Sequence, residues 1–117
     1  MYHFDSDYME GAHPAILERL TAINFDKHDG YGCDSICDSA RARIREACGA
    51  PGAEVHLLTG GTQTNATMIK ALLRPFEGAV AVDTGHINIH EAGAVEATGH
   101  KVLPLPHTDG KLCAETV

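Results

Sequence analysis

The chain has 117 residues, and 44% of them are hydrophobic, a proportion typical of a folded globular protein rather than a disordered one. Its 16 acidic residues outnumber its 9 Lys and Arg residues, which leaves a net charge of −7 with histidine neutral. This balance argues against a nucleic-acid or anionic-membrane partner, because binding to phosphates depends on clustered cations.

The first residues and the cysteines favour a cytoplasmic protein. The segment MYHFDSDYMEG lacks the basic start and the apolar stretch of a signal peptide. No apolar run approaches the ~20 residues that span a bilayer. Without an export signal disulfides are not expected, and the cysteines are predicted to be free and mostly buried. They are Cys33, Cys37, Cys48 and Cys113.

Two helices are predicted in the first half of the chain. The first begins at Pro14, which suits the first turn of a helix. A polar loop containing glycine follows over residues 26–35. The second helix runs through ARARIREACG, with Ser35 or Asp38 as its cap and Gly49 at its end. The apolar face of the first helix is formed by Ile16, Leu17, Leu20 and Ile23.

Strands and helices alternate in the second half of the chain. Pro75 ends one of the helices at Arg74, Gly93 weakens the next one, and Pro104 favours an edge position for the last strand. The alternation predicts an α/β fold with a largely parallel sheet. The predicted elements are a strand at 53–58, a helix at 62–73, a strand at 78–83, a helix at 88–98 and a strand at 101–106.

The junction Gly60-Gly61-Thr62-Gln63 lies between a predicted strand and a predicted helix. The first amides of a helix lack internal partners and its dipole is positive there, so the junction is a candidate anion site. Thr62, Gln63 and Thr64 add side-chain donors. The patterns of a P-loop and of G-x-G-x-x-G are both absent, which favours a single phosphate monoester. A tight turn with a polar cap is the alternative.

His86 follows the strand at 78–83, where ligands collect in α/β sheets. Its imidazole can stack on a flat ring or act as an acid or base. A helix-capping role is the alternative. Together, His86, His90 and Glu91 also suggest a metal site and a metal-dependent hydrolase, but their order matches no established zinc motif.

The last residues predict a turn at Asp109-Gly110 and the opening of a further element, with Glu115 in a helix-start position. The chain stops directly afterwards. This pattern favours an N-terminal fragment of a larger domain.

The two junctions together carry a family resemblance. The stretch LLTGGTQTNATMIKALLRPFEGAVAVDTGHINIHEAGAVEATGHKV closely resembles the threonine aldolase and aromatic amino acid beta-eliminating lyase family. The segments FDSDYMEGAHPAIL, GYGCD and GHKVLPLPHTDGKLCAE extend the resemblance over nearly the whole chain. It implies the N-terminal part of the large domain of a pyridoxal-phosphate (PLP) enzyme of fold type I, the aspartate-aminotransferase-like class. Its divisions would be a segment at 1–50 and a βαβαβ segment at 51–117.

The resemblance also implies roles for individual residues. The PLP phosphate would bind at the helix N-terminus, and His86 would stack on the pyridine ring. Glu91 would help to form the base side of the site. The phosphate-binding residues would be Gly60, Gly61, Thr62 and Gln63. The residues near the substrate would be Ser6 and Asp7, which resemble a pair near the substrate carboxylate, and Tyr31, which resembles a loop tyrosine near the cofactor or a neighbouring subunit.

The implied reaction is cleavage of a β-hydroxy amino acid to glycine and an aldehyde, with PLP as the electron sink. A homodimer or homotetramer is implied for the full-length enzyme. The Schiff-base lysine and the acid that pairs with the pyridine nitrogen lie further along the chain in this family, so this chain alone is predicted to be inactive. A non-catalytic remnant or a phosphate-binding module is the alternative. The lysines that do not match the family's lysine motif are Lys27, Lys70, Lys101 and Lys111.

Overall fold

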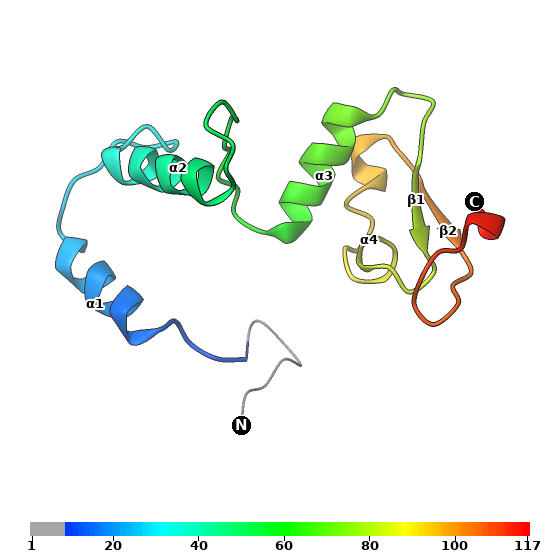
Figure 1. The fold of residues 1–117 in the computed structure, drawn as a ribbon, viewed down its shortest axis with the longest axis horizontal. Helices are drawn as coiled ribbons and strands as arrows, with labels where there is room; N and C mark the ends of the chain where they lie inside the picture. The colour runs from blue at the N-terminus through cyan, green and yellow to red at the C-terminus, as the bar shows by residue number, and fades with distance from the viewer. Residues whose placement is uncertain (1–8) are drawn as a thin grey trace. The chain divides into compact units, whose positions relative to one another are not determined.

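The computed structural model describes residues 9–117, which form two compact units. The N-terminal unit is Met1–Val55 and the C-terminal unit is His56–Val117. The substrate-pair prediction for Ser6 and Asp7 lies outside the described residues. Figure 1 shows the helices and strands of the chain in order.

The N-terminal unit contains helices α1 (Pro14–Ile23) and α2 (Ser35–Ala47). Pro14 occupies the first turn of α1, as predicted, and the Nδ1 atom of His13 accepts a hydrogen bond from the amide of Ala15. Most of the predicted apolar face of α1 is exposed: Ile16, Leu17 and Leu20 are all more than half exposed, and Ile23 is half-buried.

Helix α2 is capped by Asp34 and not by Ser35 or Asp38, so the predicted cap was wrong. The Asp34 carboxylate accepts hydrogen bonds from the amides of Ile36 and Cys37, both at 2.9 Å. Gly49, just past the end of α2, has a φ of 61°, the left-handed conformation that glycine adopts at helix ends.

The predicted strand at 53–58 is not a strand. Its backbone is bonded to side chains of α2 instead: Arg45 donates to the carbonyl of Ala53 at 2.8 Å and Arg41 to that of Val55 at 3.3 Å. A strand needs a backbone partner, and two arginine side chains occupy these acceptors.

The C-terminal unit contains the sheet and the remaining helices. Strands β1 (Ala79–Val82) and β2 (Val102–Leu105) pair in parallel, as predicted, with Ala79 opposite Val102 and Ala81 opposite Pro104. The helix α3 (Gly61–Leu72) precedes β1, and it ends earlier than Arg74 because Leu73 is already extended. The other elements are the short α-helix α4 (His86–Ile89) and two 3₁₀ helices, η1 (Glu96–Thr98) and η2 (Ala114–Thr116).

The helix predicted at 88–98 is broken in the middle. Helix α4 begins at His86 and ends at Ile89, and η1 is a separate short 3₁₀ helix. Between them Ala92 and Gly93 have φ values of 50° and 80°, which a right-handed helix cannot contain. This turn follows Glu91 directly, and the Glu91 side chain is fully buried.

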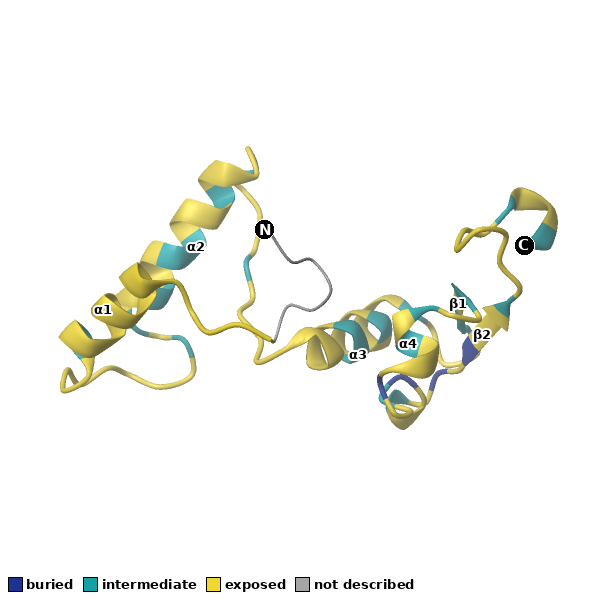
Figure 2. Cartoon of the chain, turned by 90° about the horizontal axis from the view of Figure 1, so that it is seen from below, coloured by how far each residue is buried: buried dark blue, intermediate teal, exposed yellow. Residues whose placement is uncertain are grey.

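The core of the described residues lies in the C-terminal unit. Its buried apolar side chains are those of Val95 and Val102, and its buried polar residues are Glu91 and His100. Figure 2 shows this buried set after α4 and at the start of β2. The four cysteines are free, as predicted, but they are exposed or half-buried rather than mostly buried. In the described part of the chain no helix is long and apolar enough to cross a membrane.

Candidate cofactor-binding site

The N-terminus of α3 presents open backbone donors. Gly60 is its extended N-cap residue and provides no side-chain cap. The first backbone bond of the helix runs from the amide of Thr64 to the carbonyl of Gly60, so the amides of Gly61, Thr62 and Gln63 have no intrahelical acceptor. A Cβ atom built on Gly60 or Gly61 would meet nothing within 4 Å. An anion therefore has room to approach these amides.

The side chains around this junction divide into two groups. Gln63 turns back along the chain, where its Oε1 accepts from the amide and the hydroxyl of Thr59 at 2.9 and 2.7 Å. The Thr64 hydroxyl donates to the carbonyl of Gly60 at 2.9 Å. Among residues 9–117 the hydroxyl of Thr62 has no hydrogen-bond partner, unlike the side chains of Gln63 and Thr64. Thr62 is therefore the side chain at this junction that is free to bind an anion.

Glu91 joins α3 to α4 through a single oxygen. Its Oε1 accepts a hydrogen bond from Nδ2 of Asn65 at 2.6 Å and lies 3.0 Å from Nδ1 of His86. The Glu91 side chain is completely buried, whereas that of His86 is 62% exposed. Among the described residues, Oε2 of Glu91 has no hydrogen-bond partner. The two donors thus hold one oxygen of a buried carboxylate.

This contact determines how His86 is presented. With Nδ1–H donating to Glu91, a neutral imidazole has a bare Nε2 that can only accept a hydrogen bond. The ring of His90 lies beside it, with centroids 5.4 Å apart and planes tilted by 47°. Gly85, the N-cap of α4, places His86 close after β1, at the carboxyl end of that strand. The arrangement therefore offers an exposed, oriented imidazole where ligands of α/β sheets bind.

Sequence reasoning missed Asn65. A signal was present, because Asn65 lies three residues after Thr62 and so shares its face of α3. This places the Asn65–Glu91–His86 contacts one turn along the helix from the candidate anion site.

Tyr31 lies outside the unit that contains this group. Tyr31 belongs to the N-terminal unit, is fully exposed and has a φ of 60°. Its predicted role near the cofactor or a neighbouring subunit remains a prediction.

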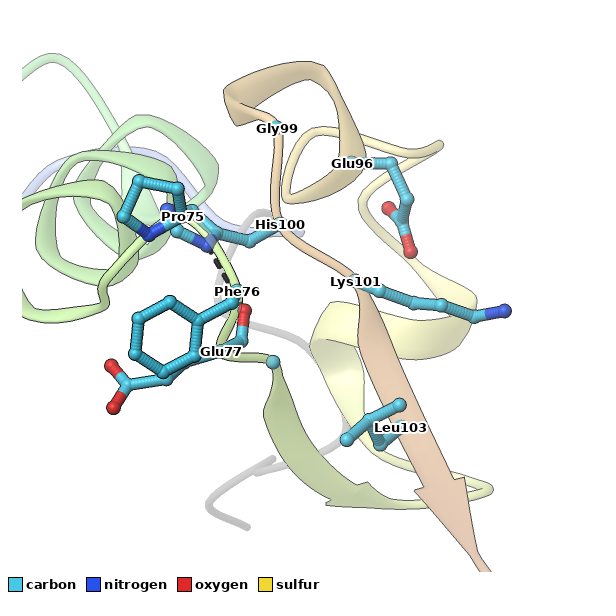
Figure 3. Close-up of a pocket in the computed structure, with 9 residues that line it drawn as sticks. Pro75, Phe76, Glu77, Glu96, Gly99, His100, Lys101 and Leu103 are labelled. Atoms are coloured by element: carbon cyan, nitrogen blue, oxygen red, sulfur yellow. Dashed lines mark hydrogen bonds between the residues drawn. The ribbon is translucent and has the colours of Figure 1, made fainter.

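A separate pocket lies at the other end of the sheet, where Gly78 and Lys101 precede β1 and β2 (Figure 3). His100 lines it, and its Nδ1 lies 3.1 Å from the carbonyl of Glu77, as the dashed line in Figure 3 marks. Ligands of α/β sheets bind at the carboxyl ends of strands, so this pocket is not the favoured site. The metal-hydrolase alternative also lacks support, since no three His, Cys, Asp or Glu residues among 9–117 are grouped to hold a metal ion.

Comparison with known proteins identifies the family and the fold. The family described as beta-eliminating lyase matches residues 3–117. A similar solved structure is the threonine aldolase of Leishmania major, which is 47% identical to this chain with a TM-score of 0.88. The match covers 95% of this chain and 32% of that one, so the chain spans about a third of the solved relative. No curated protein matches.

The chain has the α/β architecture of the large domain of fold type I enzymes, the class to which threonine aldolases belong. It belongs to the beta-eliminating lyase family. Enzymes of this family generally depend on PLP.

Proposed function

We propose that this chain supplies the phosphate- and ring-binding part of a PLP-dependent lyase that cleaves β-hydroxy amino acids to glycine and an aldehyde. The observation that carries the proposal is the link between two features of one unit. The free amides of α3 and the exposed imidazole of His86 are connected through Asn65 and the buried Glu91.

The residues of the α3 junction fit the phosphate of PLP. A phosphate needs several donors and a positive potential, and a helix N-terminus offers both. The open space at Gly60 and Gly61 admits phosphate oxygens close to the backbone. The Thr62 hydroxyl would add a donor to those of the amides. Gln63 would contribute its backbone amide, since its side-chain oxygen is bonded to Thr59.

His86 fits the ring of the same cofactor. An exposed imidazole with a fixed edge can lie flat against a pyridine ring. When bound, PLP withdraws electrons from the substrate, so that the bond between Cα and Cβ can break. The chain's own contribution is to orient the ring, and to present Nε2 of His86 as an acceptor toward the substrate. Glu91 holds the proton of Nδ1 in place.

The proposal extends to residues and properties beyond this unit. Ser6, Asp7 and Tyr31 are proposed to bind the amino acid substrate, as the family resemblance implies. A homo-oligomer is proposed as well, and the uncovered apolar face of α1 supports it. A cytoplasmic location is supported by the four free cysteines, which suit a reducing compartment.

A chimera tests the proposed function. In this aldolase chimera, the residues of this chain replace the segment that they match in the L. major threonine aldolase. The expected result is a soluble protein of the parent's oligomeric state that binds PLP and converts threonine to glycine and acetaldehyde. PLP binding without cleavage would favour the non-catalytic alternative. A folded chimera that binds no PLP would refute the proposal.

A further inference from the structure

Helix α3 carries Asn65 as well as the candidate anion site. Asn65 touches neither that site nor the exposed face of His86. Its Nδ2 lies 2.6 Å from Oε1 of Glu91, and the same oxygen is 3.0 Å from Nδ1 of His86. Asn65 is half-buried and Glu91 is buried, so water competes little for these contacts. The three side chains come from α3, from the turn after α4 and from the start of α4.

We propose that Asn65 is a positioning residue that acts through Glu91 to hold His86 in its Nδ1–H form, with Nε2 bare. This inference rests on the proposed function for its consequence in catalysis. The placement of the proton itself depends only on residues of this chain.

The hydrogen-bonding capacities of the groups support the proposal. A carboxylate only accepts hydrogen bonds, so the Asn65 amide must donate through Nδ2 and His86 must donate through Nδ1. Free histidine in water favours the opposite neutral tautomer, with the proton on Nε2. In the proposed arrangement, the contact with Glu91 holds His86 in the tautomer that free histidine disfavours.

Asn65 is, besides His86, the second donor to the Glu91 carboxylate. Oε2 of Glu91 has no partner among the described residues. The Asn65 amide is therefore, with His86, what fixes the rotation of the Glu91 side chain. Without it the carboxylate can turn, and the Nδ1–H bond of His86 loses its fixed acceptor.

Matched variants separate this role from general packing. Asn65→Leu keeps the shape of the side chain and removes the donor, and Asn65→Ala serves as a second variant if the first fails to fold. Asn88→Leu is the control. Asn88 lies on the same short helix, two residues after His86, but its amide donates to the carbonyl of Asp83 at 2.7 Å rather than to Glu91.

The decisive measurement is the tautomer of His86 by nitrogen NMR of ¹⁵N-histidine protein, without PLP, in the 117-residue chain and in the aldolase chimera. The His86 signals are identified by their loss in His86→Gln. We expect the Nδ1–H form in the parent and in Asn88→Leu, and a shift toward the Nε2–H form in both Asn65 variants. An Nδ1–H form that persists in both Asn65 variants, or that is absent from the parent, would overturn the proposal.

The activity of the chimera distinguishes this failure from that of the proposed function. We expect Asn65→Leu to lower kcat for threonine about tenfold or more, because small misplacements of a site residue are costly, with KM changed much less. An inactive parent chimera whose His86 tautomer still follows Asn65 would refute the function and retain the positioning role. An active parent chimera in which substitution of Asn65 changes neither the His86 tautomer nor kcat would support the function and refute the positioning role.

Discussion

Asn65 and Glu91 are 26 residues apart in the chain, yet Nδ2 of Asn65 lies 2.6 Å from Oε1 of Glu91. This contact ties α3, whose N-terminus carries the candidate phosphate site, to the turn after α4, where Glu91 also contacts His86. The proposed phosphate-binding and ring-binding parts of the site are therefore connected by side chains within one compact unit. Each part can be tested by substitutions in the aldolase chimera.

Thr62→Ala should weaken the retention of PLP. The lost hydrogen bond to a charged phosphate contributes about 1.5–3 kcal/mol, which corresponds to a rise in Kd of roughly tenfold to a hundredfold. Fluorescence titration of the apo-chimera with PLP measures this. The matched control is Thr67→Ala, further along the exposed side of α3. Equal PLP affinities of the two variants would show that Thr62 does not bind the phosphate.

His86→Ala should loosen PLP by about 1 kcal/mol, the contribution typical of an aromatic contact. It should also lower kcat. His86→Phe keeps a flat ring and removes both nitrogens, so it should retain the affinity for PLP while kcat stays low. Binding and threonine cleavage are measured on the same preparations. Unchanged affinity and turnover in His86→Ala would place His86 outside the site.

Gly85→Ala should disturb the site through the backbone. A Cβ atom at Gly85 would lie 2.9 Å from the carbonyl oxygen of Val82, closer than real contacts allow. The start of α4, and His86 with it, must then move. The Cβ atom added in Gly61→Ala would meet no atom within 4 Å, so the fold should stay intact. It would occupy the open space proposed for the phosphate, so only PLP binding should weaken. Melting temperatures and PLP affinities of both variants test this contrast, and equal melting temperatures would contradict it.

Acid should weaken the start of α2. Hydrogen bonds from the Cys37 thiol and from the amides of Cys37 and Ile36 lower the pKa of Asp34 from 3.8 to about 2. Because the folded pKa is depressed, this contribution to stability is complete above the ordinary pKa and is lost as the pH falls toward 2. Helicity followed by circular dichroism from pH 5 to 2 should fall less steeply in Asp34→Ser, which keeps an uncharged cap. Identical curves would contradict the assignment.

The same contact should make Cys37 unreactive. Its hydrogen bond to Asp34 raises the pKa of the Cys37 thiol above the ordinary value, so less thiolate is present near neutral pH. Mass spectrometry after brief alkylation should show slower labelling of Cys37 than of the exposed Cys33 and Cys48. In Asp34→Ser the labelling of Cys37 should accelerate while that of Cys48 stays constant. Unaltered labelling of Cys37 in that variant would count against the contact.

Local patterns predicted much of the fold. Pro14 and Gly49 marked ends of α1 and α2, the apolar runs marked β1 and β2, and the Asp109-Gly110 pair forms a turn in which both residues have positive φ. These features depend on neighbours in the sequence. The family resemblance, carried by the two motif-rich junctions, predicted the fold class.

Long-range contacts account for the errors. The segment at 53–58 has the composition of a strand, but Arg41 and Arg45 bind its carbonyl groups. The break after α4 depends on the left-handed Ala92, which no propensity indicates. The partnership of Asn65 with Glu91 spans two helices, so a sequence pattern could place Asn65 on the face of Thr62 but could not identify its partner.

The most direct test of the central claim is a crystal structure of the aldolase chimera with PLP bound. The account predicts the phosphate against the amides of Gly61 and Thr62, and the pyridine ring stacked on His86, whose Nδ1 stays on Glu91. A phosphate held elsewhere, or a ring that does not contact His86, would contradict it.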